Sequence, residues 1–168
     1  GMTIAHIGVG VFAIGVTVTQ TYRIEKDIAL KPGETVEMQG YTFQFNSTRP
    51  VQGPNFDAIE SEVTITRDGK PVATLHPQKR VYRVQRSPMT EAGIHVKWSR
   101  DLFVAMGEDL GQGAWSMRIQ YKPMVRYIWL GALIMALGGI VAVTDRRYRT
   151  RRATAADSVG AAGTAPAR

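Results

Sequence analysis

Two long, uncharged apolar segments near the ends of this chain constrain its fold more than any other feature. The first covers residues 2–21 and the second covers residues 127–144, and neither carries a formal charge. An α-helix rises 1.5 Å per residue, so about twenty residues cross the hydrocarbon core of a bilayer. We therefore predict one transmembrane helix over residues 1–21 and another over residues 125–144.

The residues that flank the second segment predict the orientation of both helices. Arg126, Tyr127 and Trp129 suit the membrane interface at its start, and five arginines follow its end within residues 145–152. Arginine clusters of this kind mark the cytoplasmic side of a membrane. We therefore expect residues 22–124 to form an extracytoplasmic, periplasmic domain, and residues 145–168 to form a basic, disordered cytoplasmic tail.

Charge and cysteine content exclude several classes of function. The formal net charge is +7, but +4 of it lies in residues 145–168. A nucleic-acid-binding protein would carry its excess charge on the folded domain, so we expect no nucleic-acid partner. The chain has no cysteine, which excludes disulfides, thiolate metal sites and cysteine nucleophiles.

Alternation of apolar and polar residues with a period of two predicts short β-strands between the apolar segments. The candidate strands lie at residues 22–30, 41–46, 59–65, 72–75, 81–85, 94–98, 102–106 and 114–121. Turn sequences occur at residues 31–34 (KPGE) and 67–70 (RDGK), and Gly107 and Gly111 also read as turn residues. The expected fold class is therefore membrane α plus all-β, with two transmembrane helices flanking a small extracytoplasmic β-barrel or β-sandwich.

His6 is the main candidate for a functional side chain. It is the only ionisable side chain in the first apolar segment, and such residues usually face a helix bundle or a cofactor. His6, Gly10, Ala13 and Thr17 share one helical face of small residues, which leaves room beside the ring for a helix or a flat group. An imidazole nitrogen can ligate haem iron. From spacing alone, a hydrogen bond to another helix and a position at the headgroup level remain open alternatives.

The other polar candidates have simpler interpretations. His76 and His95 have no second histidine or carboxylate at ligand spacing, so we interpret both as surface or loop residues. The basic run in residues 79–86 is interpreted as a strand with a solvated face. Its functional alternative is a docking edge for an acidic partner or for haem propionates.

Several motifs of this chain resemble one known family. They are residues 75–82 (LHPQKRVY), 88–94 (PMTEAGI), 100–108 (RDLFVAMGE), 1–8 (GMTIAHIG), 129–139 (WLGALIMALGG) and 145–149 (DRRYR). Together they resemble the C-terminal part of CcmF, the haem-lyase subunit of bacterial cytochrome c maturation, and the paralogue NrfE is similar as well. The resemblance covers nearly all of the chain as far as Arg149, and its motifs occur in the order of the family.

The resemblance implies a function for the whole protein. Members are bacterial inner-membrane proteins with many helices, and they work with CcmH-type and CcmE-type maturation proteins to deliver haem to apocytochrome c. A histidine at the position of His6 is an axial ligand of a b-type haem in this family. The resemblance therefore assigns haem-iron ligation to His6, with haem b as the cofactor of the full-length protein.

The same resemblance sets limits on this chain. The tryptophan-rich haem-handling loop of the family and its second haem ligand lie upstream, so we expect this chain to be a piece of a longer protein that is not catalytic alone. The segment 95–99 (HVKWS) departs from the family pattern, so no role is carried over to His95. The alternative function is a non-enzymatic, membrane-anchored periplasmic interaction domain without a cofactor.

Overall fold

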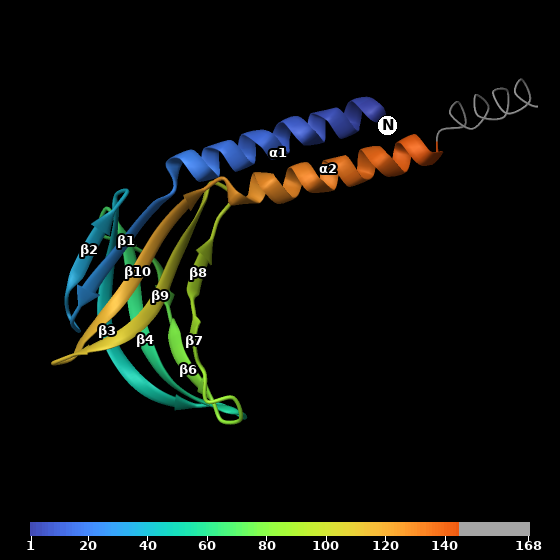
Figure 1. Ribbon diagram of the computed structural model, residues 1–168. Coiled ribbons are helices and arrows are strands. Elements are labelled where there is room, and N and C mark those ends of the chain that lie inside the picture. Colours follow the sequence, from blue (N-terminus) through green and yellow to red (C-terminus); the bar gives the residue numbers. More distant parts are fainter. Residues whose placement is uncertain (145–168) are drawn as a thin grey trace, which may run out of the picture. The chain divides into compact units, whose positions relative to one another are not determined.

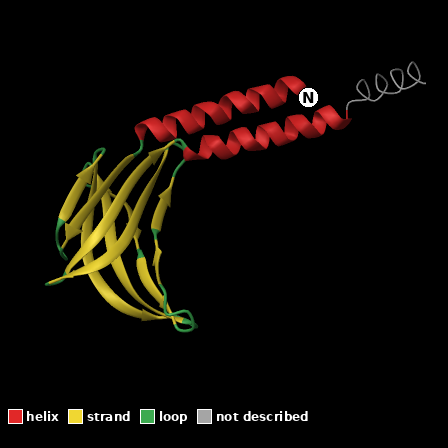
Figure 2. Cartoon of the chain, viewed as in Figure 1, coloured by secondary structure: helices red, strands yellow, loops and turns green. Residues whose placement is uncertain are grey.

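The computed structural model describes residues 1–144, so the predicted basic tail lies outside the described residues. An α-helix forms at each apolar segment, α1 (Met2–Tyr22) and α2 (Val125–Thr144), and all the strands lie between them in the chain (Figures 1 and 2). Both helices are long and apolar enough to cross a membrane by length and composition. The described residues divide into a helix pair and a β-unit that covers residues 17–126.

The helix pair is packed through glycines that recur at intervals of seven residues. Gly8 and Gly15 are the buried residues of α1, and Gly131 and Gly138 are those of α2. A Cβ atom added to Gly131 would lie 2.4 Å from the backbone nitrogen of Phe12. A side chain cannot approach a backbone so closely, so the short separation between the antiparallel helices depends on glycine.

The β-unit consists of ten strands within the described residues. These are β1 (Ile24–Leu30), β2 (Thr35–Met38), β3 (Tyr41–Gln52), β4 (Phe56–Arg67), β5 (Lys70–Leu75), β6 (Gln78–Tyr82), β7 (Pro88–Glu91), β8 (Gly93–Val96), β9 (Arg100–Gly111) and β10 (Ala114–Pro123). One sheet has the order β1-β10-β9-β8, and the other has the order β2-β3-β4-β6-β7 with β5 paired to β4. Only Ala92 separates β7 in one sheet from β8 in the other, so the chain passes directly between the sheets at this side.

The hydrophobic core lies between the inner faces of the two sheets. Alternate residues of each long strand point inward, as in a β-sandwich with one solvated face per sheet. The most completely buried apolar side chains are Phe43, Phe45, Ile65, Leu102, Val104, Met106, Met117 and Ile119. The expected class of two terminal apolar helices flanking a β-rich domain is confirmed, and the barrel-or-sandwich alternative resolves to a sandwich.

Both turns predicted from the sequence are present, and the second closes a hairpin between β4 and β5. The backbone N–H of Glu34 donates to the carbonyl of Lys31 at 3.0 Å, which closes the first turn. Asp68 and Gly69 have φ angles of 50° and 73°, the conformation that favours an Asp-Gly pair between two strands. These turns were predictable because their chemistry is local in sequence.

Other sequence-based predictions were wrong or incomplete. Gly107 is not a turn residue: it lies inside β9, where a Cβ atom would come within 3.1 Å of the Ser116 carbonyl oxygen. The strand predicted at residues 81–85 lies earlier, at β6, because a hydrogen bond of 2.8 Å from Arg86 N–H to the Tyr82 carbonyl closes a turn there. The short strands β2 and β7 were not predicted at all.

Candidate functional site

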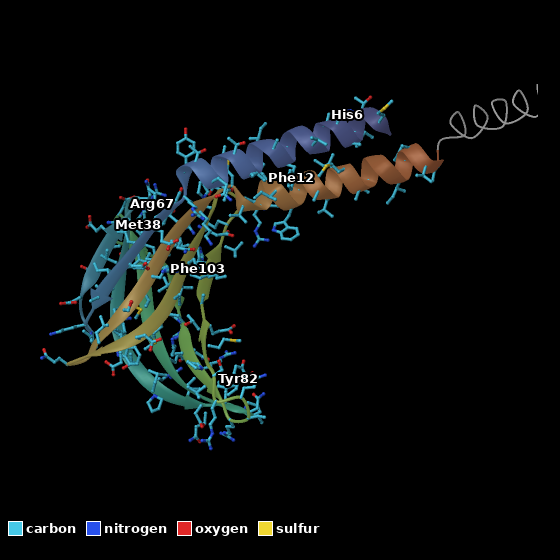
Figure 3. The ribbon with its side chains drawn as sticks, in the orientation of Figure 1. His6, Phe12, Met38, Arg67, Tyr82 and Phe103 are labelled. Carbon is cyan, nitrogen blue, oxygen red and sulfur yellow. The ribbon has the colours of Figure 1, made fainter. Side chains whose placement is uncertain are left out.

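His6 lies in the first two turns of α1, with an exposed imidazole (Figure 3). Its Nδ1 atom is 2.8 Å from the carbonyl oxygen of Met2. A carbonyl oxygen can only accept a hydrogen bond, so Nδ1 carries the hydrogen and the neutral ring keeps its lone pair on Nε2. Metal-ligating histidines commonly donate one ring N–H to a backbone carbonyl in this way. Nε2 is therefore the ring nitrogen that this hydrogen bond leaves free to accept.

The face of α1 that carries His6 points away from α2. His6 and Gly15 are nine residues apart, which at 100° per residue places them about 180° apart around the helix axis. Gly15 and Gly8 pack against α2, whereas Gly10 and Ala13 on the His6 face are exposed. No heavy atom lies within 4 Å of a Cβ position at Gly10. Among the described residues, the His6 face is thus uncovered and has room for a flat group.

His76 lies next to a buried carboxylate that the sequence did not indicate. Its Nδ1 atom is 3.8 Å from Oε1 of Glu60, a residue of β4 that is only 7% exposed. Glu60 also accepts hydrogen bonds from Arg49 Nε at 2.8 Å and from Gln78 Nε2 at 2.5 Å. Burial raises the pKa of Glu60, but the hydrogen bonds from Gln78 and Arg49 and the nearby positive charge of Arg49 together lower it below its ordinary value.

We expect Glu60→Gln to destabilise the protein at neutral pH by about 1–3 kcal/mol and to flatten its loss of stability in acid. The folded-state pKa is depressed, so the ionised carboxylate stabilises the fold above the unfolded-state pKa of about 4.5. That stabilisation is lost as the pH falls through the folded-state pKa. Urea unfolding across this acid range measures the effect. Glu37→Gln, an exposed carboxylate on β2, is the control, and an equal change in both variants would contradict the prediction.

A second polar cluster forms around Tyr41 at one end of the sheets. Arg67 Nη1 and Arg100 Nε donate hydrogen bonds to the Tyr41 hydroxyl at 2.9 Å and 2.8 Å. Both guanidinium groups also lie over the Tyr41 ring, at 4.9 Å and 4.5 Å from its centroid. Burial raises the pKa of Tyr41, but the hydrogen bonds from Arg100 and Arg67 and their positive charges together lower it below its ordinary value. Both arginines are far from Tyr41 in the sequence, 26 and 59 residues away, so no local motif could have indicated the cluster.

His95 lies near this cluster and is not arranged as a metal ligand. Burial, together with the positive charges of Arg100 and Lys97, lowers the pKa of His95, so the ring is uncharged at neutral pH. Across residues 1–144, no group of three or more His, Cys, Asp or Glu side chains is placed to hold a metal ion. Within the described chain, His6 is the histidine whose ring lies on an uncovered helix face.

The basic run in residues 79–86 is largely neutralised by nearby carboxylates. Lys79 contacts Glu108 at 2.6 Å, Arg80 contacts Glu91 at 3.3 Å and Arg83 contacts Asp57 at 3.1 Å. Three of its cations thus help to join neighbouring strands. This agrees with the interpretation as an ordinary strand face.

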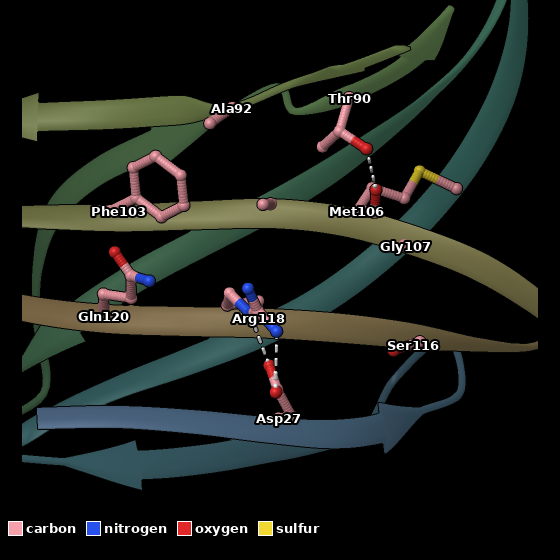
Figure 4. A pocket seen from close by; sticks show the side chains of 10 residues that line it. Asp27, Thr90, Ala92, Phe103, Met106, Gly107, Ser116, Arg118 and Gln120 are labelled. Carbon is pink, nitrogen blue, oxygen red and sulfur yellow. Dashed lines mark hydrogen bonds and ion pairs between the residues drawn. The ribbon is translucent and has the colours of Figure 1, made fainter. Parts of the chain in front are cut away.

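A shallow hollow of about 450 Å³ lies on the outer face of β1, β9 and β10 (Figure 4). Arg118 donates two hydrogen bonds to the carboxylate of Asp27, at 2.7 Å and 2.9 Å. These bonds lower the pKa of Asp27 and raise the pKa of Arg118. The lining mixes polar side chains such as Thr90, Ser116 and Gln120 with apolar ones, and among the described residues it holds no base paired with a nucleophile.

The comparisons with known proteins agree in the family they indicate. The sequence-family model described as the CcmF C-terminal β-sandwich matches residues 21–123. The cytochrome c-type biogenesis protein CcmF of Pseudomonas aeruginosa is 48% identical over 164 residues, which are 97% of this chain and 25% of that protein. CcmF of Escherichia coli is 44% identical over 151 residues, which are 90% of this chain and 23% of that protein.

A paralogue and a solved structure complete the comparison. The cytochrome c-type biogenesis protein NrfE of Haemophilus influenzae is 32% identical over 152 residues, or 90% of this chain and 24% of that protein. The solved structure of the cytochrome c haem lyase CcmF has the same fold, with a TM-score of 0.70 at 22% identity, over 84% of this chain and 24% of that one. The chain thus spans about a quarter of the length of these relatives. On the match of its β-sandwich and on these identities, the chain belongs to the CcmF family of cytochrome c-type biogenesis proteins.

Proposed function

We propose that this chain contributes a helix pair and a periplasmic β-sandwich to a membrane subunit that delivers haem to apocytochrome c, and that His6 is an axial ligand of a b-type haem in that subunit. The observation that carries the proposal is the hydrogen bond from His6 Nδ1 to the Met2 carbonyl. It leaves Nε2 free on a helix face that no described residue covers. Family membership supplies the link from this ligand to haem handling.

The proposed topology follows from the two apolar helices and their flanks. Residues 1–21 and 125–144 cross the bacterial inner membrane, and residues 22–124 lie in the periplasm. The arginines of residues 145–152 keep the C-terminal tail, residues 145–168, in the cytoplasm, since clusters of positive charge resist transfer across the bilayer.

The residues around His6 fit a haem ligand. Nε2 would hold the iron, while the Met2 carbonyl fixes the ring orientation and increases the basicity of the ligand. The open positions at Gly10 and Ala13 leave space for a macrocycle beside the ring. A bound haem would supply a redox-active iron whose potential depends on its axial ligands and on the polarity of the pocket.

The partners of the proposed subunit are CcmH-type and CcmE-type maturation proteins and apocytochrome c. This chain spans about a quarter of its relatives, so haem transfer would be an activity of the longer protein rather than of these residues alone. Within that protein, the β-sandwich would be the part of this chain that partners can reach from the periplasm.

We expect His6→Ala, introduced in the full-length protein, to abolish binding of the b-type haem that His6 ligates. Loss of the imidazole would remove the bond that His6 gives to the iron, and alanine offers no replacement donor. The measurements are the haem content of the purified membrane protein and its absorption spectrum after chemical reduction. Unchanged haem content at a normal protein level would refute the assignment.

Ile4→Ala is a suitable control for this experiment. Ile4 lies in the same part of α1 and is 42% exposed, so the substitution removes a similar volume from the helix surface. Ile4 is two residues from His6, which at 100° per residue places it about 160° away around the helix axis. It should therefore retain haem, and equal haem loss in both variants would point to a general defect of α1 instead.

A further inference from the structure

Three large apolar side chains are exposed together at one edge of the β-sandwich. Ile94 and Val96 on β8 and Trp98 in the following turn are 51%, 41% and 67% exposed. Ile94 and Val96 alternate along β8 and therefore point to the same side, and Val96 and Trp98 line one hollow. Contiguous exposed apolar surface, especially with charged neighbours, usually marks a contact site.

The turn that carries Trp98 is held next to the start of α2. The backbone N–H of Met124 donates to the carbonyl of Ser99 at 3.1 Å, and the N–H of Lys97 donates to the carbonyl of Arg100 at 2.9 Å. Trp98 and Arg126 line the same small hollow of about 270 Å³. Backbone hydrogen bonds thus fix the turn that carries Trp98 and keep this residue close to Arg126.

Arg126 is followed at once by Tyr127, the first residue of the second apolar segment. Met124 directly precedes α2, and from Val125 to Tyr127 the helix rises only about 3 Å, at 1.5 Å per residue. If α2 enters a bilayer at Tyr127, the turn bonded to Met124 lies at the level of the headgroups. The inference therefore rests on the membrane-spanning role of α2 in the proposed function.

The charges around Trp98 match a phospholipid surface. Lys97 and Arg126 line the hollow beside Trp98 and Val96, and no carboxylate lines it. Neither cation forms an ion pair within the described part of the chain. Basic residues beside a span attract anionic headgroups, and tryptophan is enriched at the membrane–water interface.

We infer that Ile94, Val96 and Trp98 form a membrane-contact patch of the β-sandwich, in which Trp98 enters the headgroup region of the leaflet where α2 begins. Lys97 and Arg126 bind the phosphates of anionic lipids around it. The patch fixes the edge of the sandwich at β8 against the bilayer, in addition to the covalent attachment through the helices.

The test uses the three tryptophans of the chain, Trp98, Trp115 and Trp129, one at a time. The double variants W115F/W129F, W98F/W115F and W98F/W129F each leave one tryptophan, and each is reconstituted as the whole chain in vesicles of phosphatidylcholine and phosphatidylglycerol. Lipids brominated near the headgroup or near the ends of the acyl chains quench tryptophan fluorescence, and the difference between them reports the depth of the tryptophan in the bilayer. Trp115 is the distal control. It lies eight residues before Pro123 on β10, and at 3.3 Å per residue this places it roughly 26 Å from the end of the strand next to α2.

We expect strong quenching of Trp98 and of Trp129 and little quenching of Trp115. Trp98 emission should fall more with lipids brominated near the headgroup than with lipids brominated near the chain ends. Quenching of Trp129 without quenching of Trp98 would overturn the contact patch but leave α2 as a span. Quenching of neither would overturn the span as well. In the Trp98-only variant, a further Lys97→Glu substitution should reduce quenching by brominated phosphatidylglycerol, and unchanged quenching would contradict the role of the cation.

Discussion

Phe45→Ala should destabilise the β-sandwich by about 3–5 kcal/mol, the range observed when a fully buried phenylalanine is truncated. Phe45 has no exposed surface and lies on β3 opposite Val63 of β4, between the two sheets. Truncation removes the ring from a close-packed core and leaves a cavity that the surrounding strands cannot fill. Domains of this size are stable by only about 5–15 kcal/mol, so this single change removes a large part of the total.

Urea unfolding of the chain in detergent, followed by the near-ultraviolet signal of the β-unit, measures this loss. Gln44→Ala is the control on the same strand, because Gln44 points to the solvated face and is exposed. It should change stability by no more than about 0.5 kcal/mol. A Phe45→Ala loss below about 1 kcal/mol would show that the two sheets do not enclose a packed core at this position.

The parts of the fold that were predictable from sequence are those with local signals. Each helix corresponds to an uncharged stretch of about twenty residues, and the hairpin between β4 and β5 corresponds to an Asp-Gly pair. The hydrogen bond from His6 to Met2 joins residues four apart, the natural spacing within one helix. Its consequence for the free nitrogen of His6 follows from the chemistry of the imidazole alone.

The parts that escaped prediction depend on contacts between distant residues. All four residues of β7 are exposed, so it has no apolar alternation and is a strand only because it pairs with β6. Glu60 and His76 meet across β4 and the turn before β6, and Tyr41 gathers arginines from two other strands. A single sequence carries no record of such pairings, because each partner looks like an ordinary polar surface residue.

The glycines that pack the two helices together were not singled out from the sequence. The small residues around His6 predicted room for a helix or a flat group, and the glycines that contact α2 lie on the opposite side of α1. Gly8 and Gly15 are spaced by two turns, as are Gly131 and Gly138, and each of the four packs against the backbone of the other helix. The small residues around His6 are left uncovered, which is what makes that face available to a ligand.

Gly131→Leu is therefore expected to separate α1 from α2 in the chain of 168 residues. A Cβ atom at this position would lie 2.4 Å from the backbone nitrogen of Phe12 and 2.7 Å from its Cα atom. Backbone atoms of a helix cannot move aside as a side chain can, so the helices must shift apart or rotate. Overpacking of this kind costs about 1–3 kcal/mol, and in lipid there is little hydrophobic driving force to restore the contact.

Spin labels at Ile7→Cys and Leu137→Cys can measure this separation, since the chain has no cysteine of its own and both positions are exposed. Gly139→Leu is the matched control: it adds the same side chain to the same helix, where a Cβ atom meets no heavy atom within 4 Å. The label distance should lengthen and its distribution broaden with Gly131→Leu, and both should stay unchanged with Gly139→Leu. Equal broadening in both variants would mean that leucine disturbs α2 itself. An unchanged distance with Gly131→Leu would mean that the glycine contact does not set how the helices pack. His6 faces away from this contact, so Gly131→Leu should lower the haem content of the full-length protein less than His6→Ala does. That difference would separate the packing role of one face of α1 from the binding role of the other.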